Sequence, residues 1–192
     1  METEEIREKK EPKRLPVWAC ILLFALGLFV CMGLYGTIGF GLLSLILGDE
    51  ARHPGLLVYT VTEANMLLSV LTPAVILLYF ERRPFSDLGL TLKGHVRGLW
   101  YGLLVAMLLY LIGFGLSLAI GEVEVTGFQF DPLNLLGTFV FCLLVALTEE
   151  IMMRGYILGR LLHTRMNKFL ALFVSALLFA LLHIFNPVSY TH

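Results

Sequence analysis

Two adjacent glutamates, Glu149 and Glu150, lie inside an apolar run over residues 143–153, and Arg154 follows one helical turn later. Each ionised side chain at the centre of a bilayer costs about 2.5–3.5 kcal/mol on insertion scales, and those that occur there usually serve a function. Residues four apart share one face of a helix, so Glu150 and Arg154 can form an ion pair that lowers the cost of burying both. Glu149 is rotated by about 100° from Glu150 and stays free to act as a general base.

His183 is a second polar residue in a membrane-grade segment, and Phe179 precedes it by one helical turn. The short polar stretch 163–168 predicts a turn centred near Met166 between two antiparallel helices. Glu149 lies seventeen residues before this centre, and His183 lies seventeen residues after it. Because both arms of a helical hairpin rise equally per residue, the two side chains should lie at one level. The sequence therefore predicts a carboxylate–imidazole site inside the membrane.

Each of these residues also has an ordinary structural interpretation. A histidine on an apolar helix often only packs and forms hydrogen bonds, and a Glu–Arg pair in a membrane often only joins helices. By the count from the turn, however, Arg154 lies beside Phe179. This convergence of charged and aromatic groups favours a functional site. Two further polar residues in an apolar run, Glu63 and Asn65, are predicted to stabilise helix packing.

The composition is that of a membrane protein. Of the 192 residues, 58% are hydrophobic and 15% are charged, whereas soluble domains carry about 25% charged residues. The net charge of −1 predicts no nucleic-acid partner. Cys20, Cys31 and Cys142 lie in apolar runs, which predicts small buried thiols rather than a disulfide or a metal cluster.

Five apolar segments are long enough to cross a hydrocarbon layer of about 30 Å, which needs about 20 helical residues. They lie within residues 17–47, 56–80, 99–120, from 133 onward, and 169–185. The sequence therefore predicts an all-α fold, a polytopic transmembrane helix bundle with about five spans. The first segment has surplus length and many glycines, which predicts a tilt or a break.

Lysine and arginine fall on alternate connections between the predicted spans. The inner segments then hold the five basic residues of the arm together with Arg82, Arg83, Lys93, Arg97, Arg160, Arg165 and Lys168, and the outer loops hold only Arg52. Because basic residues favour the cytoplasmic side, the amino terminus is predicted to be cytoplasmic. The chain is thus expected to be an integral membrane protein of the plasma membrane, with the lipid bilayer as its first partner.

Together the two motifs resemble the CPBP family, the CAAX protease and bacteriocin-processing (also called ABI) intramembrane proteases. Its first motif, Glu-Glu-x-x-x-Arg, is matched by Glu149, Glu150 and Arg154, and its second, Phe-x-x-x-His, by Phe179 and His183. The segment 82–90 resembles a stretch that often precedes the conserved domain in bacterial members. The resemblance divides the chain into a cytoplasmic polar arm (1–16), amino-terminal transmembrane helices (17–132) and the first half of a CPBP-type catalytic domain (133–192).

The resemblance implies an intramembrane endopeptidase that acts on a peptide or a lipidated protein. Glu149 would activate water for attack on the peptide bond, with His183 as its catalytic partner. Glu150, Arg154 and Phe179 would support the site. The resemblance leaves metal dependence open, and Glu149 and His183 would be the candidate ligands of a divalent metal such as zinc.

One departure from the family pattern is the third motif, His-x-x-x-Asn or His-x-x-x-Asp on a later helix, which does not occur in the sequence up to His192. We therefore expect a truncated chain of low activity, whose missing helices are supplied by further residues or by a partner. The alternative is a non-proteolytic membrane immunity or scaffold protein, or an inactive fragment. A less favoured one is a transporter fragment that uses Glu149, Glu150 and Arg154 as an ion relay.

Overall fold

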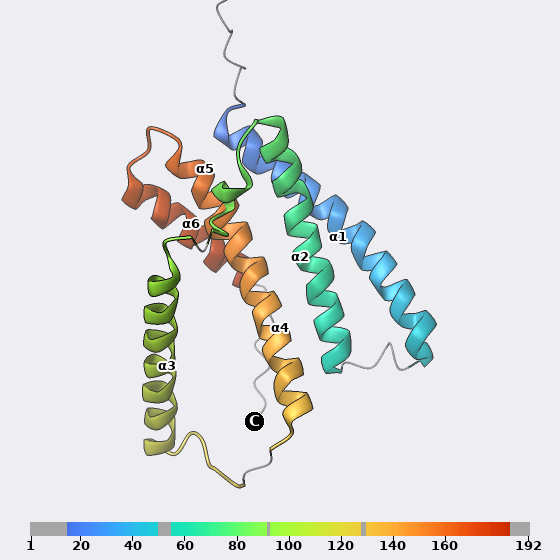
Figure 1. The fold of residues 1–192 in the computed structure, drawn as a ribbon, viewed down its shortest axis with the longest axis vertical. Coiled ribbons are helices and arrows are strands. Elements are labelled where there is room, and N and C mark those ends of the chain that lie inside the picture. The colour runs from blue at the N-terminus through green and yellow to red at the C-terminus, as the bar shows by residue number, and fades with distance from the viewer. Residues whose placement is uncertain (1–14, 50–54, 92, 128–129, 185–192) are drawn as a thin grey trace, which may run out of the picture.

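The computed structural model describes residues 15–49, 55–91, 93–127 and 130–184. Its elements are α1 (Val17–Leu47), α2 (Leu56–Phe80), the 3-10 helix η2 (Phe85–Leu88), α3 (Val96–Ala119), α4 (Pro132–Glu150), the π-helix η3 (Ile151–Leu158), α5 (Gly159–Leu162) and α6 (Lys168–His183) (Figure 1). These residues form helices and connecting segments without a strand. The predicted all-α fold is confirmed.

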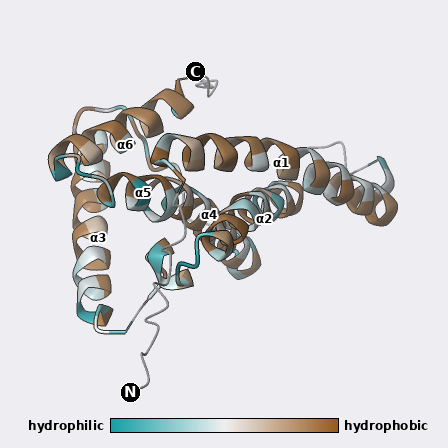
Figure 2. Ribbon diagram, turned by 90° about the horizontal axis from the view of Figure 1, so that it is seen from above, coloured by the Kyte–Doolittle hydropathy of each residue, from teal (hydrophilic) through white to brown (hydrophobic). Residues whose placement is uncertain are grey.

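Four helical rods are long and apolar enough to cross a membrane: α1, α2, α3 and the continuous rod α4–η3–α5, which has 31 residues. α6 is a shorter apolar helix of 16 residues. Hydrophobic residues cover these helices along their length, and hydrophilic ones concentrate at helix ends and connections (Figure 2). The arrangement agrees with a transmembrane bundle of about five spans, and the protein is an integral membrane protein.

α1 is one unbroken helix of 31 residues, so the first span is not broken. At 1.5 Å per residue its length is about 46 Å, more than the hydrocarbon thickness of about 30 Å, which favours a tilted helix. α1 runs obliquely to α4 in Figure 1. Small residues let α1 approach α2 closely, since a Cβ added to Gly27 would lie 2.8 Å from the Cβ of Pro73.

The packed core lies where α1, α2, η3 and α6 meet. Its largest fully buried side chains include Tyr156, Phe24 and Met153, and the rings of Phe24 and Tyr156 stack with centroids 4.3 Å apart. α3 differs, because each of its residues except Ser117 is exposed, and it stands apart from α2 and α4 in Figure 1. The core therefore joins the amino-terminal helices to the helical rod that carries the glutamates.

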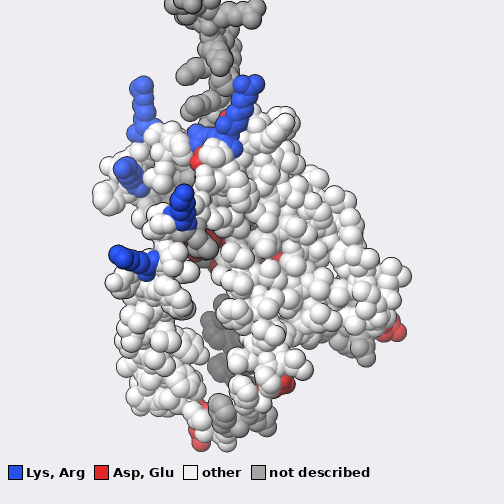
Figure 3. Space-filling model, viewed as in Figure 1, with Lys and Arg blue, Asp and Glu red and all other residues white. Residues whose placement is uncertain are grey.

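Lys and Arg side chains gather at one end of the bundle, where α2 ends and α5 meets α6 (Figure 3). Acidic residues lie at the opposite helix ends, among them Asp49, Glu122 and Asp131. The predicted separation of charge is therefore present among the described residues, whereas the basic residues of the arm and Arg52 lie outside them. Which end faces the cytoplasm stays a prediction.

Candidate active site

Two capping residues fix where the site helices begin. The carboxylate of Asp131 accepts hydrogen bonds from two backbone N–H groups of the first turn of α4, at 3.0 and 3.1 Å, and Pro132 occupies the first turn. Asn167 accepts a bond of 2.8 Å from the N–H two residues later, at the start of α6. Such caps satisfy N–H groups that have no partner within the helix. They help to set the registers in which Glu149 and His183 face each other.

Glu149 and His183 lie in contact between the two helices. His183 Nε2 is 3.3 Å from Glu149 Oε1, and His183 Nδ1 is 2.9 Å from the carbonyl oxygen of Phe179. Because a carbonyl can only accept, Nδ1–H is the donor, and Nε2 faces the carboxylate. In this orientation Nε2 can accept a hydrogen bond from a protonated carboxyl group or, in the imidazolium form, donate one to the carboxylate. The contact predicted from the turn is confirmed.

This acid–imidazole pair is open to its surroundings. The side chain of Glu149 is 34% exposed and that of His183 is 41% exposed. Glu149 also lies close to the middle of the 31-residue rod α4–η3–α5, far from both of its ends. The described helices therefore leave the pair partly uncovered at a depth that corresponds to the membrane interior.

The other motif residues complete a ring of contacts. Arg154 forms an ion pair with Glu150, and its guanidinium carbon lies 5.9 Å from the centroid of the Phe179 ring. The rings of Phe179 and His183 are 4.4 Å apart. Predicted contacts of Arg154 with Glu150 and Phe179 are thus both confirmed, and the chain of contacts returns through His183 to Glu149.

The Glu150–Arg154 pair is not buried, contrary to what the sequence suggested. The two side chains are 54% and 57% exposed, respectively. Ile151 and Met153 are buried in the core, so the helix face that Glu150 and Arg154 share points away from it. An ion pair on one helix needs no covering element, which is why the spacing predicted the contact but not its burial.

The rod changes its helical type directly after Glu150. Residues Ile151–Leu158 form the π-helix η3, whereas the sequence predicted an ordinary helix here. π-helical segments are rare in proteins, and those that occur often lie at functional sites. The Ser175 hydroxyl of α6 donates to the Met153 carbonyl at 3.2 Å. Contacts from outside the rod therefore support the unusual segment that carries Arg154.

The described residues do not complete a zinc site. They contain no group of three or more His, Cys, Asp and Glu side chains placed to hold a metal ion. Glu149 and His183 offer two donors, whereas catalytic zinc sites use three protein ligands. Ligation of a divalent metal by Glu149 and His183 stays a prediction.

Sequence reasoning missed a second Glu–Arg pair, between Glu81 at the end of α2 and Arg160 in α5. The two side chains are 9% and 5% exposed, respectively. The Cys20 thiol donates to Glu81 at 2.9 Å, and the guanidinium of Arg160 lies 5.1 Å from the ring centroid of Tyr156. The sequence predicted that Arg160 lies in the connection between the fourth and fifth spans, but the structure places it in helix α5, where it is buried. Its apolar neighbours along the chain were the signal for burial.

The three cysteines do not share one environment. Cys20 is buried, Cys31 is half-buried and Cys142 is exposed, and none of them forms a disulfide in the described chain. The prediction of buried thiols is therefore right for Cys20 and wrong for Cys142. Cys142 lies on α4 among other exposed apolar residues, which in a membrane protein is the expected environment of a lipid-facing side chain.

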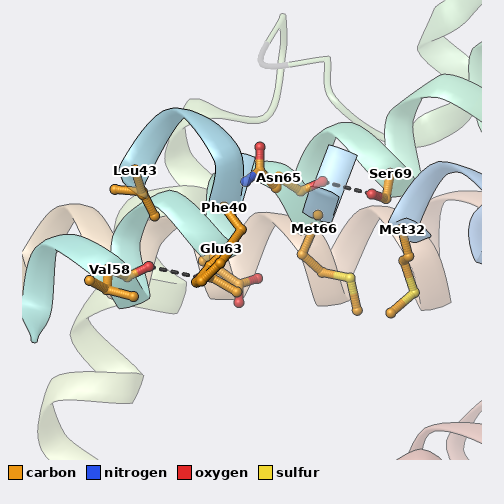
Figure 4. Close-up of a pocket in the computed structure, with 10 residues that line it drawn as sticks. Met32, Phe40, Leu43, Val58, Glu63, Asn65, Met66 and Ser69 are labelled. Carbon is orange, nitrogen blue, oxygen red and sulfur yellow. Dashed lines mark hydrogen bonds between the residues drawn. The ribbon is translucent and has the colours of Figure 1, made fainter. Parts of the chain in front are cut away.

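A pocket of about 330 Å³ lies between α1 and α2, away from the motif residues (Figure 4). Its lining includes Glu63 and Asn65. A Cβ added to Gly39 of α1 would collide with the Asn65 side chain, so Asn65 packs directly against α1, and its stabilising role stays a prediction. Among the described residues that line the pocket, Glu63 is the single carboxylate, and no histidine accompanies it. The pocket therefore lacks the acid–base pair found at Glu149 and His183.

Residues 131–191 match a protein family described as Type II CAAX prenyl endopeptidase Rce1-like. The match covers about a third of the chain and contains all five motif residues, Glu149, Glu150, Arg154, Phe179 and His183. No curated protein and no solved structure matches the chain. For this part of the chain, the resemblance to a CPBP-type protease is confirmed.

Proposed function

We propose that this protein is an intramembrane endopeptidase of the CAAX-protease type, in which Glu149 activates the water that hydrolyses a peptide bond. The observation that carries the proposal is the 3.3 Å contact between Glu149 and His183 near the middle of a membrane-length rod. The family match supports a protease of the membrane at a coarser level. The substrate would be a peptide or lipidated protein segment that enters from the bilayer.

In this mechanism the carboxylate of Glu149 takes a proton from water while the water oxygen bonds to the carbonyl carbon of the peptide. The tetrahedral intermediate then collapses, and its C–N bond breaks. Glu149 then passes the proton that it took from water to the leaving amine, which restores the carboxylate. General acid–base catalysis of this kind contributes about a hundredfold to ten-thousandfold in rate.

His183 would orient Glu149 and share its proton. Its Nδ1–H bond to the Phe179 carbonyl fixes the ring, so that Nε2 faces the carboxylate. Arg154 would hold this turn of α6 from the other side, since it lies over Phe179 and is itself held by Glu150. Each motif residue thus has a role that follows from its contact.

Purified protein in liposomes, incubated with a peptide library and read by mass spectrometry, tests the proposal. Glu149→Gln keeps the size of the side chain but removes the base, so cleavage should fall to background. Glu63→Gln removes a carboxylate that lines the separate pocket and should leave cleavage unchanged. Equal cleavage by wild type and Glu149→Gln would contradict the mechanism. A cellular phenotype that survives Glu149→Gln would instead indicate a non-proteolytic immunity or scaffold protein.

A further inference from the structure

The segment between α2 and α3 lies outside the matched residues 131–191, yet it contacts the rod of the active site. We call residues 81–88 the clasp segment. Its first contact is the buried ion pair between Glu81 and Arg160. The Cys20 thiol adds a hydrogen bond to Glu81, so α1 takes part in holding this charge. Removing one partner of such a buried pair strongly destabilises the folded protein, because the other charge stays buried without a partner.

The second contact of the clasp segment is made by its backbone. Leu88 is buried, and its carbonyl oxygen lies over Gly155, where an added Cβ would be only 2.6 Å from that oxygen. One turn later, a Cβ added to Gly159 would lie 3.5 Å from the Asp87 carbonyl oxygen, an ordinary contact. Gly155 therefore has no side chain at the point where the clasp segment touches the π-helix.

The position of these contacts matters because one lies within η3, at Gly155, and the other lies directly after it, at Arg160. A π-helical segment is a register insertion in an α-helix, and its loss would rotate the residues before it by about 100° relative to those after it. Glu149 precedes η3, whereas Arg160 follows it. Since η3 is intrinsically less favourable than α-helix, contacts from outside the rod must stabilise it.

We propose that the clasp segment is a positioning element of the active site, which holds η3 in its π-helical register through Glu81 and Leu88 and so keeps Glu149 facing His183. Its effect on catalysis rests on the proposed function. Its effect on the register of the rod does not. Neither Glu81 nor Leu88 is placed to touch the reacting atoms, and both act through the rod.

A matched pair of glycine variants tests the backbone contact. Gly155→Ala and Gly159→Ala add the same methyl group to the same rod, so their gain in helix propensity is similar. The readout is hydrogen exchange, by mass spectrometry, of the amides of residues 151–158 in the full protein in detergent. Gly155→Ala should speed this exchange by about tenfold or more, and Gly159→Ala should change it by less than about twofold. Equal exchange in the two variants would overturn the proposal.

The ion pair gives a second test that does not depend on the glycines. Glu81→Gln should speed exchange over 151–158, and the exchanged pair Glu81→Arg/Arg160→Glu should recover part of the protection. Glu122→Gln, at the opposite end of the bundle, is the control and should leave exchange unchanged. Unaltered exchange over 151–158 in Glu81→Gln would overturn the proposal even if Gly155→Ala fails to accumulate.

Kinetics separate positioning from a general loss of fold. If cleavage is observed, Glu81→Gln should lower kcat by about tenfold and leave KM near its wild-type value, because the rod and not the substrate site is disturbed. A loss that merely follows the amount of folded protein would argue against positioning. If neither wild type nor any variant cleaves peptides, the proposed function fails, and the exchange comparison still decides whether the clasp segment holds η3.

Discussion

The protein has two Glu–Arg pairs whose arginines, Arg154 and Arg160, lie within two turns of each other on the same rod, and the surroundings of the pairs are opposite. Glu150 and Arg154 belong to one helix, and their side chains are mostly exposed. Glu81 and Arg160 come from different helices and are almost fully buried. The local pair lies in the ring of contacts around Glu149, whereas the buried pair joins the amino-terminal helices to the matched domain.

The difference shows that burial, and not charge, decides what such a pair does. The described helices do not cover the exposed pair, so its residues remain free to take part in the site. In a buried pair each charge needs the other, because an unpaired ion in the core is costly. Under the proposed function, the chemistry lies on the open face of the rod and the structural charges lie on the packed face.

The largest expected effect on cleavage comes from removing the His183 imidazole on the open face of the rod. His183→Ala should lower kcat by about a hundredfold or more without reducing the amount of folded protein. His163→Ala is a close control, because His163 makes the same kind of hydrogen bond through Nδ1, to the Gly159 carbonyl at 2.6 Å, but has no carboxylate at its other ring nitrogen among the described residues. Kinetics in liposomes measure both. If kcat falls by a similar factor in both variants, His183 has no special catalytic role, and the open face of the rod is not the site of the chemistry.

Arg160→Ala should have the largest effect on stability. It leaves the Glu81 carboxylate buried without its partner, which costs about 3–5 kcal/mol. Membrane yield and the thermal unfolding midpoint in detergent should both fall sharply. Replacing both residues by leucine should recover part of the loss, since no lone charge remains. Wild-type yield of Arg160→Ala would show that this pair is as dispensable as the exposed one.

Arg154→Ala should separate activity from stability. Because the Glu150–Arg154 pair is more than half exposed, its loss should cost less stability than loss of the buried Glu81–Arg160 pair. Cleavage should still fall, by roughly tenfold, since Arg154 no longer holds Phe179 and the turn of His183. The checks are yield, thermal midpoint and kcat on one preparation. A strong drop in the yield of Arg154→Ala would show that the Glu150–Arg154 pair is needed for stability, as the buried Glu81–Arg160 pair is expected to be.

The smallest effect is expected from Tyr156→Phe. The Tyr156 hydroxyl lies 3.5 Å from the Cys20 carbonyl oxygen, at the limit of a hydrogen bond, and the stacking on Phe24 is retained. Stability should change by less than about 1 kcal/mol. Tyr156→Ala, which removes the buried ring, should cost about 3–5 kcal/mol as aromatic-to-alanine changes in cores do. Thermal unfolding in detergent distinguishes the two, and a large loss in Tyr156→Phe would mean that the hydroxyl holds the core.

Much of the candidate site was predictable because it depends on local geometry. The pairing of Glu150 with Arg154 follows from helical spacing, and the level contact of Glu149 with His183 follows from equal rise on the two sides of a turn. The π-helix was not predictable in this way. Its residues resemble those of any apolar helix. The contacts that support it come from other segments: Leu88 of the clasp segment lies against Gly155, and Ser175 of α6 donates to the Met153 carbonyl.

By itself, the sequence determined the helical spans, the polar residues within them and the register that brings Glu149 to His183. Apolar length, capping and helical rise are properties of a single segment and its turn, so they can be predicted from the local sequence. Only the tertiary structure decided that Arg160 is buried against Glu81, that Arg154 is open, and that Leu88 lies over Gly155. Burial and close backbone approach depend on which helices meet, and packing between segments distant in the chain leaves no fixed spacing in the sequence.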